Sequence, residues 1–245
     1  MTIKVGVIGA AGRMGLEASR AVEVDRELEL VARVEHGDSL DALTDAGAEV
    51  AVDFTTPDAV GDNVRICVGK GIHVVVGTTG LSDEDLAEIQ GWTADSSANV
   101  FVAPNFAIGA VLMMSFAAQA SAWFKTAEIV ERHHERKLDA PSGTALRTAK
   151  LMNERRGDGW SAPSGGKESL PGSRGGDVGG IRVHSLRVPG SVAHQEVVLG
   201  SPGETLTIRH DSLERASFMP GVVLAVKKVP SLRGLTVGLE HLLDL

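Results

Sequence analysis

The chain of 245 residues has a single cysteine, Cys67, which excludes an intramolecular disulfide and fits a reducing compartment. It also lacks long apolar runs. None reaches the roughly 18 residues that a membrane span requires, and the longest, 108–124, is interrupted by polar residues such as Ser115 and Gln119. The amino terminus has too short an apolar run for a signal peptide and no cleavage site. We therefore expect a cytoplasmic protein.

Positive charge is also in short supply. The chain has 24 lysines and arginines against 32 aspartates and glutamates, which gives a formal net charge of −8. Nucleic acids and anionic membranes are bound by basic surfaces, so we expect neither as a partner. The apolar content of 43% and the charged content of 23% are ordinary for a globular protein of one or two domains.

The first informative motif follows a short apolar run at residues 3–8. It carries Gly9, Gly12 and Gly15 and leads directly into a helical pattern. A strand, a glycine turn and a helix in that order are the context of a dinucleotide-binding fingerprint. The glycines permit a tight turn and let a pyrophosphate approach the start of the helix. The G-x-x-G-x-x-G spacing is one residue longer than the commonest form, and a purely structural turn is the alternative.

Glu35 follows the second apolar run and lies 20 residues beyond Gly15. An acidic residue at about this distance hydrogen-bonds the ribose hydroxyls of the cofactor in the fingerprint. It favours NADH because it would repel the 2′-phosphate of NADPH. Arg13, Arg33 and a protonated His36 could offset that repulsion. We therefore expect use of both cofactors, with a lean towards NADH.

Three further apolar runs, at residues 48–54, 72–77 and 99–106, alternate with helical patterns. This alternation predicts a Rossmann-like, doubly wound parallel sheet, which binds ligands at the carboxyl ends of its strands. Residues 77–79 and 103–106 lie at such ends. We expect both turns to contact the cofactor.

The stretch 126–145, TAEIVERHHERKLDAPSGTA, combines an expected strand with an expected helix start. Its first half suits a strand, Pro141 ends that strand, and a helical pattern begins near Ser142 and Gly143. The first backbone N–H groups of a helix have no partner within it and attract carboxylate or phosphate. Gly143 lets an anion come close, and the Thr144 hydroxyl adds a donor.

The same stretch contains His133, His134 and Lys137. A histidine titrates near neutral pH and can donate a proton to a reacting substrate, while Lys137 adds a positive charge beside the helix start. The two histidines should point in different directions in extended chain. A solvated histidine pair beside an ordinary helix cap is the alternative. The combination of all these features favours a site that binds a carboxylate and protonates a neighbouring atom.

A glycine-rich stretch, 155–180, predicts a mobile loop that could act as a lid. Three β-rich segments follow, at 181–188, 194–200 and 204–212, and resemble a largely antiparallel meander. Together with the strand at 126–134 they would form an open sheet of about four strands. One exposed face of this sheet is a natural place for self-association.

Residues 217–229 return to a helical pattern, and 235–243 resemble a final strand or turn that joins the first domain. We therefore expect an α/β protein in two domains. Residues 1–106 with 217–245 would bind the dinucleotide through the parallel sheet. Residues 107–216 would form a smaller α+β domain with the open mixed sheet, for substrate binding and oligomerisation.

Taken together, these motifs show that the chain resembles the dihydrodipicolinate reductase (4-hydroxy-tetrahydrodipicolinate reductase) family of the diaminopimelate and lysine pathway. The resemblance covers nearly the full length. It is carried by VGVIGAAGRMG, VDFTTP, GTTG, APNFAIG, ERHHERKLDAPSGTA, RGGDVGGIRVHSLR, AHQEVVLG and RASFMPGVVLA. The HH-x-x-K-x-DAPSGTA block is highly specific to that family.

The resemblance implies hydride transfer from NADH or NADPH to a cyclic dicarboxylate, in a homotetramer assembled through the smaller domain's sheet, and no resident metal. His133 would be the proton donor and acceptor and Lys137 a second proton donor. The substrate would be bound by His134, Gly143, Thr144 and, as a weaker candidate, Arg215. The cofactor would be held by Gly9, Ala10, Ala11, Gly12, Arg13, Met14, Glu35, Gly77, Thr78, Thr79, Ala103, Pro104, Asn105 and Phe106. Ala11 departs from relatives that place a lysine there, which leaves Arg13 as the main contact for a cofactor phosphate.

Two other functions remain open at this point. One is a different amino-acid-pathway dehydrogenase on the same fold, acting for example on aspartate or homoserine. The other is a nucleotide-sensing regulator that binds the cofactor without catalysis. His133 and Lys137, both present, argue against the second.

Overall fold

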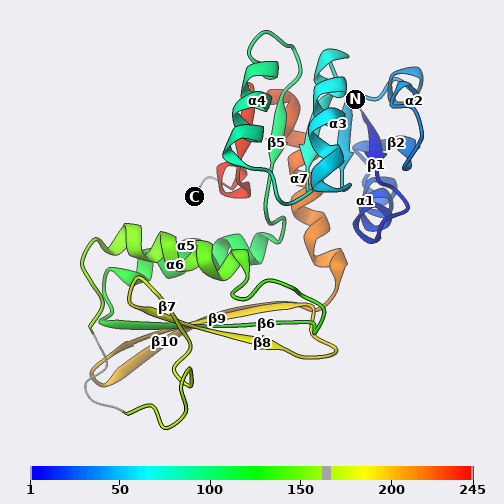
Figure 1. Ribbon diagram of the computed structural model, residues 1–245. Coiled ribbons are helices and arrows are strands. Elements are labelled where there is room, and N and C mark those ends of the chain that lie inside the picture. Colours follow the sequence, from blue (N-terminus) through cyan, green and yellow to red (C-terminus); the bar gives the residue numbers. More distant parts are fainter. Residues whose placement is uncertain (1, 162–166, 244) are drawn as a thin grey trace. The chain divides into compact units, whose positions relative to one another are not determined.

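The structure, a computed structural model, describes residues 2–161, 167–243 and 245 (Figure 1). The chain forms two compact units. Unit 1 comprises Met1–Ile108 with Arg215–Leu245, and unit 2 comprises Gly109–Glu214. Among the described helices, none is both long enough and apolar enough to cross a lipid bilayer.

Unit 1 contains a six-stranded sheet in the order β11-β5-β4-β3-β1-β2, in which every pair of neighbours is parallel. Its strands are β1 (Ile3–Ile8), β2 (Leu28–Val34), β3 (Val50–Asp53), β4 (His73–Val76), β5 (Val100–Val102) and β11 (Leu235–Val237). The central strands are short runs of mostly β-branched residues whose side chains are fully buried, as expected of a parallel sheet covered on both faces. The predicted doubly wound sheet is confirmed.

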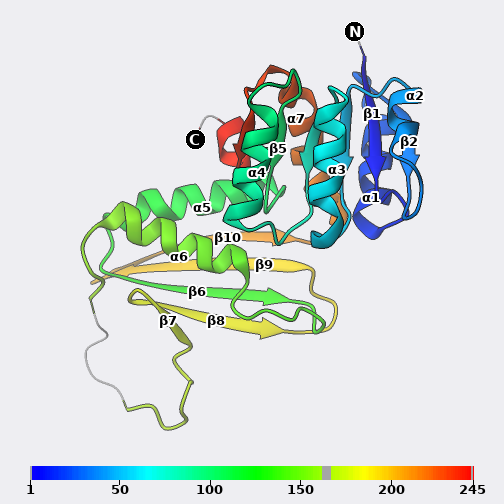
Figure 2. The same ribbon diagram turned by 45° about the horizontal axis from the view of Figure 1, so that its top comes forward.

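Helices cover the two faces of this sheet, with α3 and α4 on one side and α1 and α7 on the other (Figures 1 and 2). Ser82 and Asp85 form a capping box at the start of α4, and Cys67 is buried as a structural thiol. The helices are α1 (Arg13–Val24), α2 (Asp41–Asp45), α3 (Pro57–Gly69), α4 (Asp83–Thr93) and α7 (Met219–Lys228), with 3₁₀ turns η1 (Arg215–Phe218), η2 (Val229–Ser231) and η3 (Leu239–Leu242).

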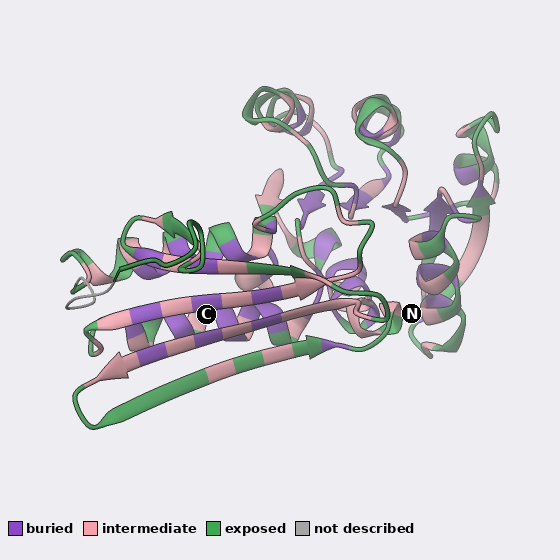
Figure 3. Ribbon diagram, turned by 60° about the horizontal axis from the view of Figure 1, so that its bottom comes forward, coloured by how far each residue is buried: buried purple, intermediate pink, exposed green. Residues whose placement is uncertain are grey.

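Unit 2 contains a five-stranded mixed sheet in the order β10-β9-β6-β8-β7. The strands are β6 (Thr126–His133), β7 (Gly176–Val178), β8 (Ile181–Arg187), β9 (Ala193–Ser201) and β10 (Glu204–Ser212), and the helices are α5 (Ile108–Ser121) and α6 (Gly143–Arg156). The side chains of Ile129, Met152, Ile181 and Leu199 form part of the core of this unit. Most of β10 is exposed (Figure 3).

The structure corrects two expectations for this sheet. The stretch 155–180 contributes a fifth strand, β7, which pairs antiparallel with β8. In addition, β6 lies between β8 and β9 and pairs parallel with β8, so among the three segments of the expected meander only β9 and β10 pair with each other as a hairpin. Alternation identifies strands but carries no information on their neighbours or direction, which are set by the packing of the sheet. Residues 162–166 of the expected lid lie outside the described residues.

A matched pair of glycine substitutions tests the packing of unit 1. A Cβ at Gly15 in α1 would lie 2.0 Å from the Gly9 carbonyl oxygen and 2.8 Å from the Ala10 Cα, whereas one at Gly61 in α3 would meet nothing within 4 Å. We expect Gly15→Ala to lower the free energy of unfolding by about 1–3 kcal/mol through overpacking. Gly61→Ala should raise it by about 0.5–1 kcal/mol through helix propensity. Denaturant titrations measure both, and equal effects would contradict the tight turn.

Candidate active site

The turn from β1 into α1 is closed tightly by its glycines. Gly9 has a φ of +75°, and a Cβ there would lie 2.8 Å from the Phe54 carbonyl oxygen. The Gly12 N–H donates to the Gly9 carbonyl at 3.0 Å. Gly12 is also the N-cap of α1 and has no side chain to cap it. The first turn of α1 therefore keeps the open amino end that suits a phosphate.

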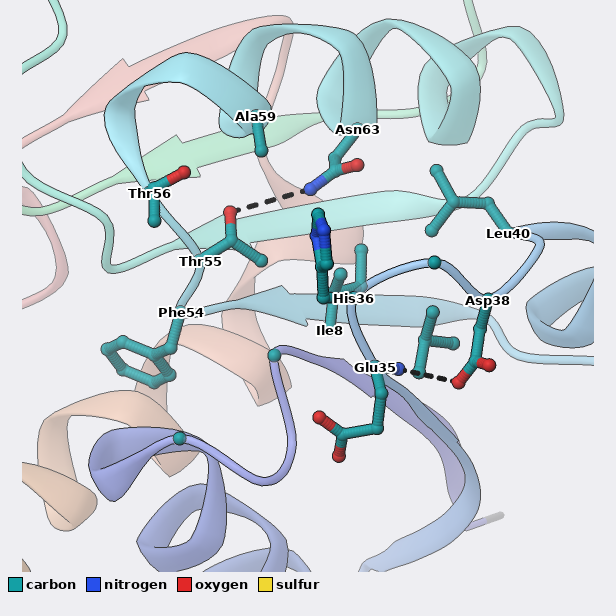
Figure 4. A pocket seen from close by; sticks show the side chains of 14 residues that line it. Ile8, Glu35, His36, Asp38, Leu40, Phe54, Thr55, Thr56, Ala59 and Asn63 are labelled. Carbon is teal, nitrogen blue, oxygen red and sulfur yellow. Dashed lines mark hydrogen bonds between the residues drawn. The ribbon is translucent and has the colours of Figure 1, made fainter.

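This turn borders a cavity of about 470 Å³ at the carboxyl ends of β1, β2 and β3 (Figure 4). Glu35 lines it directly after β2, and its backbone N–H donates to the Asp38 carboxylate at 2.8 Å. The lining comprises Ile8, Gly9, Gly12, Val34, Glu35, His36, Gly37, Asp38, Leu40, Phe54, Thr55, Thr56, Ala59 and Asn63. Glu35 and the glycine turn thus share one cavity, as a ribose and an adjoining pyrophosphate would require.

A second cavity of about 260 Å³ shares Phe54 and Thr55 with the first. Its remaining lining residues are Arg13, Met14, Pro57, Gly77, Thr78 and Thr79. Gly77 is needed here because a Cβ would lie 2.0 Å from the Phe54 ring. Arg13 places a positive charge at this cavity, beside the start of α1.

A buried carboxylate, Asp53, fixes the loops around both cavities. One oxygen accepts from the Thr55 hydroxyl at 2.7 Å, the Thr55 N–H at 2.9 Å and the Thr78 hydroxyl at 2.9 Å. The other accepts from the Asn63 amide at 2.8 Å. Burial of the Cys67 thiol and, to a lesser extent, the nearby charge of Asp53 raise the pKa of that thiol to about 12. Asp53 therefore joins the end of β3, the loop after β4 and helix α3.

Eight of the fourteen residues expected to hold the cofactor line one of the two cavities: Gly9, Gly12, Arg13, Met14, Glu35, Gly77, Thr78 and Thr79. The other six, Ala10, Ala11, Ala103, Pro104, Asn105 and Phe106, belong to neither lining. Phe106 is buried and packs edge-on against Phe54, with ring centroids 6.1 Å apart, so it supports the cavity wall from behind.

Sequence reasoning missed several lining residues. Phe54 ends the apolar run 48–54 and Thr55 follows it, so both could have been found by that position, whereas Asn63 lies within α3 and carries no local signal. Arg33 was expected to offset the charge of Glu35. Its guanidinium forms an ion pair with Glu23 at 2.5 Å, and it lines neither cavity.

In unit 2 the site is built on the end of β6. Ala127, Ile129 and Glu131 alternate along the strand as its buried row, and His133 continues the same face two residues later. Glu131 is fully buried although it carries a carboxylate. Such a group requires partners, because an unpaired buried charge costs several kcal/mol.

Glu131 has partners on both oxygens. Oε2 lies 2.5 Å from His133 Nδ1 and accepts from Arg187 Nη1 at 2.9 Å. Oε1 accepts from Arg187 Nη2 at 2.9 Å and from the Ser142 N–H at 3.2 Å. Burial opposes ionisation, but the hydrogen bonds from His133, Arg187 and Ser185 outweigh it and lower the pKa of Glu131 to about 2. The carboxylate is therefore ionised at neutral pH.

The turn between β6 and α6 carries Lys137. Its ammonium lies 2.7 Å from the Asp139 carboxylate, and this bond lowers the pKa of Asp139. The Lys137 N–H donates to the His134 carbonyl at 3.1 Å, and Arg187 Nη2 donates to the Asp139 carbonyl at 2.6 Å. The turn is thus held at both ends, with Lys137 still about one quarter exposed.

Helix α6 starts as predicted, with Ser142 as its N-cap. The Ser142 hydroxyl accepts from the Ala145 N–H at 3.2 Å. Gly143 is exposed, and nothing lies within 4 Å of the place that a Cβ would take, so a ligand can reach the backbone. Thr144 follows it and accepts from the Thr148 hydroxyl at 2.7 Å through its carbonyl.

Unit 2 therefore brings His133, Lys137 and the start of α6 together around Glu131 and Arg187. Neither of the last two was anticipated, although Glu131 could have been noticed as an acidic residue in the buried row of a strand. Arg215 belongs to unit 1, where it begins η1. In the described part of the chain, no three histidine, cysteine, aspartate or glutamate side chains form a group that could hold a metal ion.

Comparison with known proteins places the chain. Residues 3–106 match the amino-terminal model, and 109–243 the carboxyl-terminal model, of the family described as dihydrodipicolinate reductase. The 4-hydroxy-tetrahydrodipicolinate reductase of Corynebacterium diphtheriae is 54% identical over 100% of both chains. That of Streptomyces griseus is 54% identical over 99% of this chain and 98% of its own.

Among solved structures, a dihydrodipicolinate reductase from Paenisporosarcina sp. with dipicolinate bound is 39% identical and has a TM-score of 0.90, covering 98% of this chain and 99% of its own. Both halves of the sequence and the fold thus match the same family. The chain belongs to the dihydrodipicolinate reductase family.

Proposed function

We propose that this chain reduces 4-hydroxy-tetrahydrodipicolinate to tetrahydrodipicolinate, with His133 and Lys137 as its proton donors and with NADH preferred over NADPH. Family membership makes it a nicotinamide-dependent reductase of the diaminopimelate and lysine pathway. The observation that carries the residue assignment is the cluster in unit 2, where His133 and the start of α6 share the ionised carboxylate of Glu131.

The substrate is a cyclic dicarboxylate, and two features of unit 2 suit its acidic groups. Gly143 offers open backbone at the positive end of α6, where a carboxylate is stabilised by N–H groups and the helix dipole. Lys137 supplies a full positive charge from the turn before that helix. We assign Thr144, with its hydroxyl, and His134 to the same carboxylate. Arg215 remains a candidate for orienting the substrate.

Reduction of an unsaturated ring also requires a proton. When bound, the nicotinamide supplies the hydride, and the chain must supply an acid beside the ring. His133 suits this task because its Nδ1 is held by Glu131, which leaves Nε2 to face a ligand. Lys137 is the second donor in the proposal. Fixing the carboxylates at α6 aligns the ring with these donors, which is an orientation effect.

The residues of unit 1 fit a dinucleotide. The glycine turn provides a cradle that a Cβ at Gly9 or Gly15 would fill, and Glu35 shares its cavity. Glu35 would accept hydrogen bonds from the ribose hydroxyls and disfavour a 2′-phosphate. Arg13, at the neighbouring cavity, would attract cofactor phosphate and so permit use of NADPH as well.

We further propose a cytoplasmic homotetramer. The biosynthetic family and the single, buried cysteine support the compartment. The long and largely exposed β10 lies at the edge of the unit 2 sheet and supports assembly through that sheet. An edge strand presents backbone N–H and C=O groups that can pair with another chain.

Variants of the two proton donors test the activity. With substrate made from pyruvate and aspartate semialdehyde, we expect His133→Gln and Lys137→Ala each to lower kcat by more than about 100-fold, since positioned acids contribute 10²–10⁴. His184→Gln, on the same sheet, and Lys150→Ala, on the surface of α6, are the controls and should stay within about twofold of the unaltered chain. NADH oxidation is followed by absorbance.

Absence of turnover by the unaltered chain would reject the proposed reaction. NADH binding without turnover would favour the regulator, and turnover of aspartate or homoserine would favour the other dehydrogenase. Full activity in both donor variants would remove their role as acids.

The cofactor preference is tested at Glu35. We expect Glu35→Ala to raise the KM for NADH about 10-fold through loss of the ribose hydrogen bonds, and to lower or leave unchanged the KM for NADPH, because a repulsive charge is removed. Glu29→Ala, an exposed site on the same strand, is the control. Parallel titrations of the two cofactors give the answer. An equal loss for both would show that Glu35 does not contact the ribose.

A further inference from the structure

The proposed chemistry does not explain why Glu131 is buried in unit 2, although burying its charge costs desolvation free energy. It occupies a position in the buried row of β6 where Ala127 and Ile129 precede it, and its side chain is fully inaccessible to solvent. An apolar residue at this position would avoid the cost of desolvating a charge. Stability alone therefore does not account for a carboxylate here.

Glu131 contacts His133 and the start of α6 directly and is connected to the Lys137 turn through Arg187. One oxygen lies 2.5 Å from His133 Nδ1. The other accepts the N–H of Ser142, the residue that caps α6. Arg187, which makes two bonds of 2.9 Å to this carboxylate, also donates to the backbone of Asp139 in the Lys137 turn.

We propose that Glu131 is a positioning residue for His133, fixing the neutral ring as the Nδ1–H tautomer so that Nε2 faces the substrate. This inference rests on the proposed function of His133 as an acid. When the ring is protonated, the same carboxylate stabilises the imidazolium, and Nε2–H is the proton that can be given away. The logic is that of the buried aspartate that orients the histidine of a serine protease.

Arg187 completes this arrangement. Without a cation, a buried glutamate beside a histidine could take the shared proton itself. The two bonds from Arg187 help to lower the pKa of Glu131 to about 2, so that the proton between the two groups belongs to His133. The bond from Arg187 to the Asp139 carbonyl holds the Lys137 turn against the same pair.

The structure contains a second histidine–glutamate pair that serves as a matched control. In the same sheet, His184 Nε2 lies 2.8 Å from Glu128 Oε2, and Glu128 is also paired with an arginine, Arg174. Both members are more exposed than Glu131. Here the carboxylate contacts Nε2, so this pair should hold the opposite tautomer.

The first measurement uses the unaltered protein. Two-bond ¹H–¹⁵N spectra of histidine rings distinguish the two neutral tautomers, and His133→Gln assigns the signal among the eight histidines. At a pH high enough for both rings to be neutral, we expect the Nδ1–H tautomer at His133 and the Nε2–H tautomer at His184. An Nε2–H tautomer at His133 would overturn the proposal without any further variant.

The second measurement compares Glu131→Gln with Glu128→Gln. Glutamine has one acceptor oxygen, for which Arg187 and His133 compete. We expect Glu131→Gln to reduce the Nδ1–H fraction at His133 and to lower kcat by roughly 10- to 100-fold, less than the loss of a positioned acid. NADH affinity, a property of unit 1, should be unchanged. Glu128→Gln should alter His184 alone and leave kcat within about twofold.

An unchanged tautomer at His133 with kcat within about twofold in Glu131→Gln would refute positioning, whatever happens to stability. The tautomer is read without turnover, so it remains decisive if His133→Gln proves fully active. In that case the acid role of His133 fails, and the ring geometry is judged separately.

Discussion

The ion pair between Glu131 and Arg187 is the interaction on which the proposed catalytic region depends. It brings a full charge into the core of unit 2, at the end of the central strand β6. Because both carboxylate oxygens must be satisfied there, His133 and the start of α6 lie beside Glu131, and Arg187 also binds the turn between them. The geometry of the site therefore follows from the requirement to compensate one buried charge.

Unit 1 uses the same device. Asp53, at the end of β3, is buried and accepts four hydrogen bonds from the two neighbouring loops and α3. In a parallel sheet the loops at the carboxyl ends carry the ligand contacts, and they are held in place by few backbone bonds. Hydrogen bonds to the buried carboxylate of Asp53 fix the positions of these loops. In both units the residue that fixes the site lies in a strand, behind the residues expected to touch ligand.

The sequence predicted the elements and the local motifs well. The glycine turn and the start of α6 at Ser142 were both found, because each depends on residues close together in the chain. Of the expected cofactor residues, those following β2 and β4 line the two cavities, as do all those following β1 except Ala10 and Ala11. Those following β5 do not. The position of a turn at a strand end does not reveal whether its residues face a cavity or pack behind one.

What the sequence determined by itself was local: which segments form strands and helices, where they end, and which family motif they carry. The tertiary structure alone decided that β6 lies between β8 and β9, that β7 joins the sheet, and that Arg187 reaches Glu131 from 56 residues away. Strand order and long-range ion pairs depend on packing among distant segments, since the same alternation of side chains is compatible with several partners and directions. The periodicity of the sequence therefore does not predict which strands are neighbours or in which direction they run.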